Sequence, residues 1–216
     1  MYIPNSFAEH DLPTLYAFLD AHPLAALVTD SEPAGLFATH LPLLLDRTAG
    51  PVGTLFGHFA RANPHCGHVA GGPTNALVIF TGPDAYITPD WYRTKQETGR
   101  VVPTWNYVAV HAYGTLRLRD DPQFLRRHLE ALTARHEAGR VRPWGVGDAP
   151  EDFIVQQMKA IVGVELTIAR LEGKWKMSQN RSAADIDGVI HGLESSTAPR
   201  DHTVAVVVAD RRPKAR

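Results

Sequence analysis

Residues 103–118 read Pro-Thr-Trp-Asn-Tyr-Val-Ala-Val-His-Ala-Tyr-Gly-Thr-Leu-Arg-Leu. In an extended chain, alternate side chains of this stretch lie on opposite faces, and the apolar ones fall largely on one face. That face carries Val108, Val110, Ala112, Leu116 and Leu118, and the other carries Tyr107, Ala109, His111, Tyr113, Thr115 and Arg117. The pattern predicts a long strand with one buried face, and hence a fold built on a sheet.

Further strands are predicted on both sides of this one, with helices between some of them. The β-like runs are 24–29, 36–45, 54–60, 76–81, 85–88 and 164–169, separated by Gly and Pro turn signals at 31–35, 50–51 and 82–84. Helices are expected after Asp11, Asp121 and Asp148 and within 179–194, whereas residues 89–102 resemble a polar loop. This order favours a mostly β (α+β) fold, an antiparallel barrel with peripheral helices.

Size and composition narrow the class of protein. The 216 residues can bury a substantial core, which we expect to form one domain over residues 1–195, followed by a C-terminal tail over 196–216 that ends in basic residues. With 21% charged residues and a net charge of −1, the chain has no overall field that attracts nucleic acid or membranes. Short apolar runs, the lack of a signal-peptide pattern and a single cysteine predict a cytoplasmic protein without membrane contact.

The first candidate for chemistry is the end of the run at 54–60. Arg61 directly follows this predicted strand, where backbone N–H groups are unpaired and a guanidinium can bind a phosphate through two hydrogen bonds. The alternative is an arginine paired with a surface carboxylate. His58 can donate to a phosphate or play a structural part, and Asn63 before Pro64 is also typical of a turn.

A second candidate joins residues 105–107 to residues 174–180. Lys176 and Ser178 share one face of an extended chain and can reach one ligand together, although solvated lysines and helix capping by Ser178 are the alternative. Trp105 and Tyr107 suit stacking on an aromatic ligand or packing in a dimer interface.

Other chemistries receive little support. His65-Cys66-Gly67-His68 lacks the second, well-spaced pair of ligands that a metal site needs, so no metal is expected. The chain contains neither a Gly-x-Ser-x-Gly elbow nor a Gly-x-Gly-x-x-Gly or Walker-type loop. The sequence thus indicates neither a hydrolase nor a Rossmann or P-loop nucleotide site.

Several long motifs occur in order along nearly the whole chain. They include Phe-Ala-Thr-His-Leu-Pro-Leu-Leu at 37–44, Gly-His-Phe-Ala-Arg-Ala-Asn-Pro at 57–64, Phe-Thr-Gly-Pro-Asp-Ala-Tyr-Ile at 80–87, Val-Pro-Thr-Trp-Asn-Tyr-Val-Ala-Val-His at 102–111 and Glu-Gly-Lys-Trp-Lys-Met-Ser-Gln-Asn at 172–180. Together they resemble the PaiB-type, FMN-binding negative transcriptional regulators. One departure is His65-Cys66, where the family leads us to expect Gln-Trp.

The resemblance implies an FMN-binding split β-barrel that forms a homodimer with flavin at the subunit interface. The cofactor-binding residues it suggests are Thr39, His40 and Leu41 along the isoalloxazine, His58, Ala60, Arg61 and Asn63 at the phosphate, and Lys176, Ser178 and Gln179 completing the site. Trp105, Asn106 and Tyr107 are also expected to bind the cofactor, because their side chains suit a polar ligand with rings. The resemblance implies a repressor that reaches DNA directly or through another protein, with no catalytic residues. The alternative on the same fold is an FMN-dependent oxidoreductase of the flavin reductase, oxidase or haem-degrading type.

Overall fold

The computed structural model describes residues 1–31 and 35–213, and within them eight strands form one sheet. The sheet order is β3-β2-β6-β7-β8-β5-β4, with β1 paired to β8. The strands are β1 (Ala8–Glu9), β2 (Leu24–Ser31), β3 (Gly35–Pro42), β4 (Leu44–Asp46), β5 (Thr54–Ala60), β6 (Thr74–Ile87), β7 (Thr104–Arg119) and β8 (Ile161–Lys176). The helices are α1 (Leu12–Ala21), α2 (His65–Val69), α3 (Arg93–Thr98), α4 (Pro122–Glu137), α5 (Glu151–Lys159), α6 (Ala183–Glu194) and α7 (Pro199–Asp210). The predicted α+β fold with an antiparallel sheet is confirmed.

The elements with the strongest local signals form as expected. In β7, Val108, Val110, Ala112 and Leu116 are all at most 2% exposed, which confirms the predicted buried face except at Leu118, which is only half-buried. Helix α4 begins with Asp121 as its N-cap, whose side chain accepts a hydrogen bond from the Gln123 N–H, and Pro122 occupies the first turn. The turn signal at 31–35 includes residues 32–34, which lie outside the described residues.

The turn expected at Gly82-Pro83-Asp84 is wrong, because β6 continues without interruption from Thr74 to Ile87. A Cβ at Gly82 would lie 2.6 Å from the Phe18 ring and 3.2 Å from Val108 Cβ. The glycine therefore lets the Phe18 ring pack directly against the strand, and its role is close packing rather than chain reversal.

Two segments expected to be irregular are helical. Residues 89–102 contain the 3₁₀ turn η2 (Pro89–Trp91) and helix α3, rather than a plain loop. The segment 196–216, expected to be a tail, contains α7, in which Val204, Ala205 and Val208 are buried. Its charged end masked this apolar stripe, and the last three residues, 214–216, lie outside the described residues.

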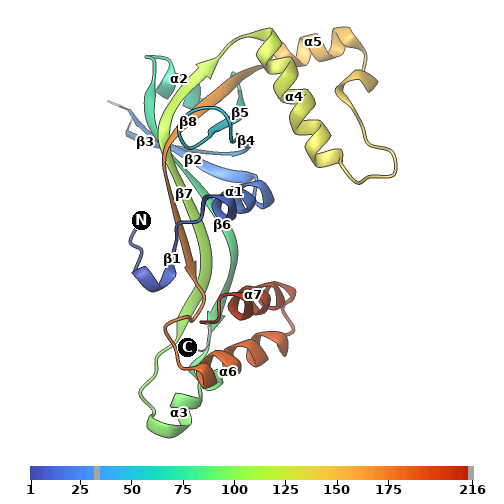
Figure 1. Ribbon diagram of the computed structural model, residues 1–216. Helices are drawn as coiled ribbons and strands as arrows, with labels where there is room; N and C mark the ends of the chain where they lie inside the picture. The colour runs from blue at the N-terminus through green and yellow to red at the C-terminus, as the bar shows by residue number, and fades with distance from the viewer. Residues whose placement is uncertain (32–34, 214–216) are drawn as a thin grey trace. The chain divides into compact units, whose positions relative to one another are not determined.

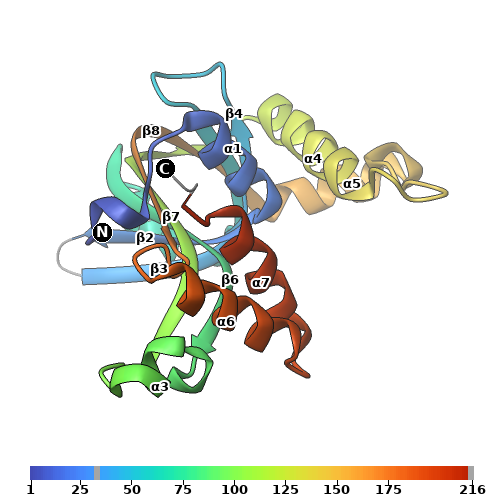
Figure 2. The same ribbon diagram turned by 60° about the horizontal axis from the view of Figure 1, so that its bottom comes forward.

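The chain divides into two compact units, each assembled from separate segments. The first unit comprises residues 1–18, 81–110 and 172–216, and the second comprises residues 19–80 and 111–171. In the first, α6 and α7 lie side by side (Figures 1 and 2). In the second, β2 pairs with β3 and β4 with β5, while α4 and α5 lie next to each other (Figure 1).

No helix in the described part of the chain has the length and apolar character needed to span a bilayer.

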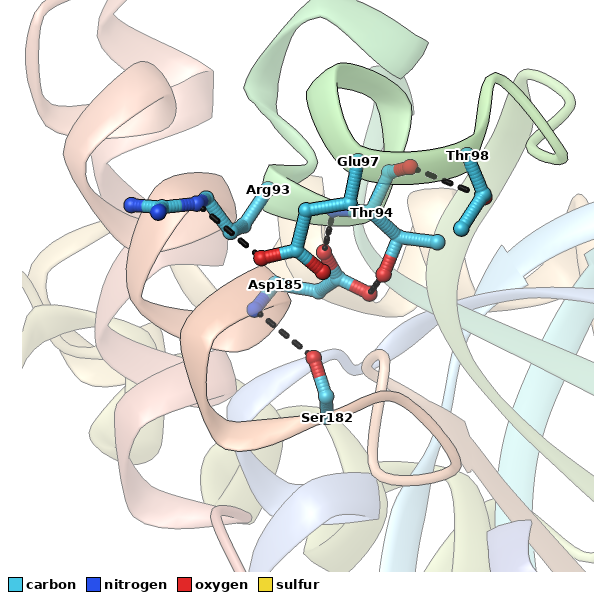
Figure 3. Close-up of polar contacts among 6 residues, drawn as sticks. All are labelled: Arg93, Thr94, Glu97, Thr98, Ser182 and Asp185. Carbon is cyan, nitrogen blue, oxygen red and sulfur yellow. Dashed lines mark hydrogen bonds and ion pairs between the residues drawn. The ribbon is translucent and has the colours of Figure 1, made fainter.

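A buried carboxylate ties α3 to α6 in the first unit (Figure 3). Asp185 is 3% exposed, and its two oxygens accept hydrogen bonds from the Thr94 backbone N–H at 2.9 Å and the Thr94 hydroxyl at 2.8 Å. Burial alone would raise the pKa of Asp185, but these hydrogen bonds outweigh it and hold the pKa below its usual value. The carboxylate therefore caps α3 from another helix.

Replacing Asp185 with alanine is expected to lower the free energy of unfolding by about 1–3 kcal/mol, because the Thr94 donors lose their partner. Denaturant unfolding measures this change. The matched control is Asp187→Ala on the same helix, where the carboxylate is 56% exposed and pairs with Arg212 at 2.6 Å. Because that ion pair is exposed to solvent, its loss should change the free energy of unfolding only slightly. Equal losses in the two variants would show that the link to α3 is unimportant.

Candidate functional site

In the second unit, the loop after β5 is held by a buried histidine. His65 is fully buried at the start of α2, with Nε2 2.8 Å from the Thr29 hydroxyl and Nδ1 2.8 Å from the Thr39 hydroxyl. The Thr39 oxygen also accepts from the Asn63 amide at 3.1 Å, and the Asn63 side-chain oxygen accepts from the His65 N–H at 2.9 Å. The structure thus brings together Thr39 and Asn63, two of the residues predicted to contact FMN, through a histidine that was not predicted.

Arg61 already has protein partners. Its Nε donates to the Lys159 carbonyl at 2.9 Å, and its two terminal nitrogens form a bidentate pair with the Asp120 carboxylate. Both side chains of this ion pair are largely exposed, so water screens the attraction. An incoming phosphate would compete with Asp120 for the guanidinium, and two of its five N–H groups are not used in these contacts.

The loop offers fewer free backbone donors than expected. The Arg61 N–H donates to the Ala160 carbonyl at 2.8 Å, and the Asn63 N–H donates to the Ala60 carbonyl at 2.9 Å. His58 contacts another histidine, with its Nδ1 3.1 Å from Nε2 of His128. Burial lowers the pKa of His58, so the ring is neutral at pH 7 and offers a phosphate a hydrogen bond rather than a charge.

The predicted residues of β3 point in alternate directions. Thr39 is half-buried and belongs to the His65 network, His40 is exposed, and Leu41 is 3% exposed in the core. In this unit, Leu41 therefore contributes packing, whereas His40 is open to a ligand or partner.

The first unit holds the other predicted residues. Asn106 is 1% exposed, and its amide nitrogen donates to the Ser178 hydroxyl at 3.0 Å. Lys176 Nζ donates to the Thr104 hydroxyl at 2.5 Å and to the Trp105 carbonyl. Gln179 closes the turn, since its side chain accepts from the Met177 N–H and donates to the Trp175 carbonyl. Ser178 has φ +63°, a left-handed conformation that is uncommon outside glycine and often marks functional sites.

Three cations of this unit form no ion pair with a carboxylate in the described residues, although the charge of Arg181 helps to lower the pKa of the nearby Asp185. Lys174 Nζ lies 5.0 Å from the Tyr107 ring centroid, and the Arg181 guanidinium lies 4.8 Å from that of Tyr92. Within the described residues, neither these two nor Lys176 forms an ion pair with a carboxylate. Burial, and then the charges of Lys174 and Arg181, lower the pKa of Lys176. A group of cations that repel one another is stabilised by an anion, so this donor set fits an anionic ligand with aromatic rings, such as a flavin nucleotide.

The two sets of predicted residues therefore occupy different units, and each forms its own hydrogen-bonded cluster. Sequence reasoning missed His65, His128 and Asp120, the protein partners of the predicted residues. Of these three, only His65 could have been noticed in the sequence, because the family leads us to expect Gln at this position after Pro64. Both its ring nitrogens bond to threonine hydroxyls, and no group of three metal-ligating side chains occurs in residues 1–31 and 35–213.

Comparisons with known proteins agree with these features. A family model described as "Putative FMN-binding domain" matches residues 1–170. A protein of Aspergillus fumigatus is 35% identical over 98% of this chain and 97% of its own length. The Bacillus subtilis protein named "Protease synthase and sporulation protein PAI 2" is 30% identical over 99% of both chains.

Solved structures share the fold at low sequence identity. The flavocytochrome Anf3 from Azotobacter vinelandii aligns with a TM-score of 0.55 and 17% identity, over 78% of this chain and 69% of its own. The FAD- and haem-binding protein from Mycobacterium smegmatis aligns with a TM-score of 0.54 and 20% identity, over 78% and 73%. The conserved protein Rv2991 from Mycobacterium tuberculosis aligns at 0.57 and 13%, over 84% and 94%. These similarities confirm the split-barrel fold class.

Proposed function

Because this chain belongs to the FMN-binding domain family, whose cofactor is FMN, we propose that it is a PaiB-type negative regulator of transcription that works as a homodimer with flavin at the subunit interface. The observation that carries the proposal is the match to the Bacillus subtilis protein over 99% of both chains, since the name of that protein links it to protease synthesis and sporulation. A relative that aligns along its whole length is stronger support for a shared role than similarity of fold alone.

Exposed aromatic rings on the first unit support the dimer. Trp105 is 47% exposed and Tyr86 is 48% exposed, and their rings meet edge to face with centroids 6.0 Å apart. Large aromatic side chains left in water together are typical of surfaces that bind a partner or a planar ligand. The neighbouring cations Lys174, Lys176 and Arg181 supply positive charge that suits an anionic ligand.

The residues of the chain would bind and orient the cofactor. When bound, FMN supplies a redox-active or signal-sensing ring system. Lys176 and Arg181 would offset negative charge on the ligand, and the Asn106–Ser178 pair would present hydrogen-bonding groups at a fixed position. In the second unit, the Thr39, Asn63 and His65 network would hold the shape of the loop that carries Arg61.

A pair of variants tests whether Arg61 binds the phosphate. Arg61→Ala is expected to weaken FMN binding by roughly tenfold or more, the range for a hydrogen bond to a charged group. Asp120→Asn removes the competing carboxylate and should leave FMN binding equal or tighter. Flavin fluorescence quenching on titration gives both dissociation constants. Equal affinity in Arg61→Ala and the unmodified protein would remove Arg61 from the site.

Regulation is tested by gel retardation of promoter fragments taken from beside the gene for this protein, with and without FMN. The net charge of −1 predicts binding that depends on a local basic surface and is weakened by salt. Sequence-selective retardation supports the repressor. The absence of retardation, together with NAD(P)H-dependent flavin reduction faster than that of free FMN, would instead support an FMN-dependent oxidoreductase.

A further inference from the structure

A cavity of about 340 Å³ opens in the second unit between helix α4 and strands β4, β5, β7 and β8. It is lined by Leu44, Phe56, Arg119, Phe124, Arg127, His128, Ala131 and Glu165. None of the residues predicted to bind FMN is among them. Its volume lies at the lower end of the range for pockets that bind small organic molecules.

The walls of the cavity suit a planar apolar group. The Phe56 and Phe124 rings meet edge to face with centroids 5.6 Å apart. The His128 ring lies parallel to that of Phe124, with an interplanar angle of 4° and centroids 6.1 Å apart. Leu44 and Ala131 complete the apolar lining. An aromatic ring packs well on such a surface through edge-to-face and offset contacts.

The cavity carries one unbalanced positive charge. Arg119 is neutralised by Glu165, whose carboxylate lies 2.6 Å from its guanidinium. Burial and the nearby His58 lower the pKa of His128 to about 4, so this ring is uncharged at pH 7. Arg127 is exposed and forms no ion pair with any residue that the structure describes. An occupant with a single negative charge would balance Arg127.

His128 has an unused hydrogen-bonding atom. The residue is 5% exposed, and its Nδ1 has no hydrogen-bond partner among the described residues. A buried polar atom without a partner is rare in folded proteins. When His128 Nε2 accepts a hydrogen bond from the His58 Nδ1–H, the neutral His128 ring carries its own proton on Nδ1, which is then a donor. The His128 ring therefore holds a buried donor that no described residue satisfies.

We propose that this cavity is a second ligand site, which binds a small aromatic carboxylate with its ring against Phe56 and Phe124 and its carboxylate toward Arg127. The site is distinct from the residues expected to hold FMN and does not depend on a role in transcription. His128 in the cavity wall forms a hydrogen bond with His58, one of the residues expected to lie at the flavin phosphate.

The test uses the full-length protein loaded with FMN, with benzoate as the probe and benzyl alcohol as its uncharged analogue. Benzoate is expected to bind saturably in a calorimetric titration and to shift the ¹⁵N resonances of the His128 ring, which lies in the cavity wall. Arg127→Gln should weaken benzoate binding about tenfold. This is the low end of the range for a hydrogen bond to a charged group, because Arg127 is exposed to solvent. Ala131→Leu, a change at an exposed helical position, should fill the cavity and abolish binding.

The matched control is Arg142→Gln, which removes the same charge from an exposed position outside the cavity. It is expected to bind benzoate like the unmodified protein. The proposal is overturned if the unmodified protein shows no saturable binding, if benzyl alcohol binds as tightly as benzoate, or if Arg142→Gln loses as much affinity as Arg127→Gln.

Discussion

Replacing Gly188 with alanine is expected to destabilise the protein by about 2–3 kcal/mol, even though alanine is the better helix former by about 1 kcal/mol. Gly188 lies in α6, and a Cβ there would be 1.9 Å from the backbone carbonyl oxygen of Trp91. A Cβ at Gly192, one turn later, would be 2.3 Å from the Trp91 ring. The two glycines let η2 approach α6 closely. Because the atom met by the new methyl group at residue 188 belongs to the backbone, either the helix or η2 must move.

Denaturant unfolding followed by tryptophan fluorescence measures this loss, and Trp91 itself lies at the contact. Gly67→Ala is the matched control, since Gly67 is also helical but a Cβ there meets nothing within 4 Å. That variant should be as stable as the unmodified protein or slightly more stable. If Gly188→Ala behaved like Gly67→Ala, the close approach of η2 to α6 would not exist in solution.

The sequence predicts those features of the fold that have a local signal, and it misses those that depend on tertiary contacts. β7 and α4 were predicted because their signals are local: alternating apolar residues in one, and Asp121-Pro122 before an apolar stripe in the other. The continuity of β6 was not predictable, because Gly82 has the residue type of a turn and only contact with Phe18 explains it. α7 was missed because its buried face is short and the charged end of the chain dominated the composition.

The same contrast holds for the candidate site. Thr39 and Asn63 were both predicted, and the structure joins them by a hydrogen bond of 3.1 Å. The pairing of Arg61 with Asp120 spans 59 positions in the chain, and nothing in a single sequence indicates it. Residue types at strand ends therefore suggested which groups could bind an anion, whereas their protein partners depend on tertiary contacts.

His65 gives the most direct prediction about pH. Burial and the nearby His68 lower its pKa to about 4, whereas the unfolded value is near 6.5. The unfolded chain therefore binds the proton first, so the stabilisation is fully present above pH 6.5 and is lost as the pH falls toward 4. At pH 5, this difference in the pKa of His65 alone is expected to lower the free energy of unfolding by about 2 kcal/mol. The proton would place an uncompensated charge beside Thr29, Thr39 and the Phe59 ring, which stacks on the imidazole at 5.0 Å.

His65→Gln isolates this contribution, because glutamine is the residue that the family leads us to expect here and its amide can bond to a threonine hydroxyl without titrating. Unfolding of this variant should depend less on pH between 6.5 and 4 than unfolding of the unmodified protein. Part of the dependence should remain, because burial also lowers the pKa of His128 to about 4. His136→Gln, at an exposed position of α4, serves as the control and should retain the full dependence. An unchanged pH profile in His65→Gln would mean that His65 is not held neutral by the fold, and the loop that carries Asn63 would then need another support.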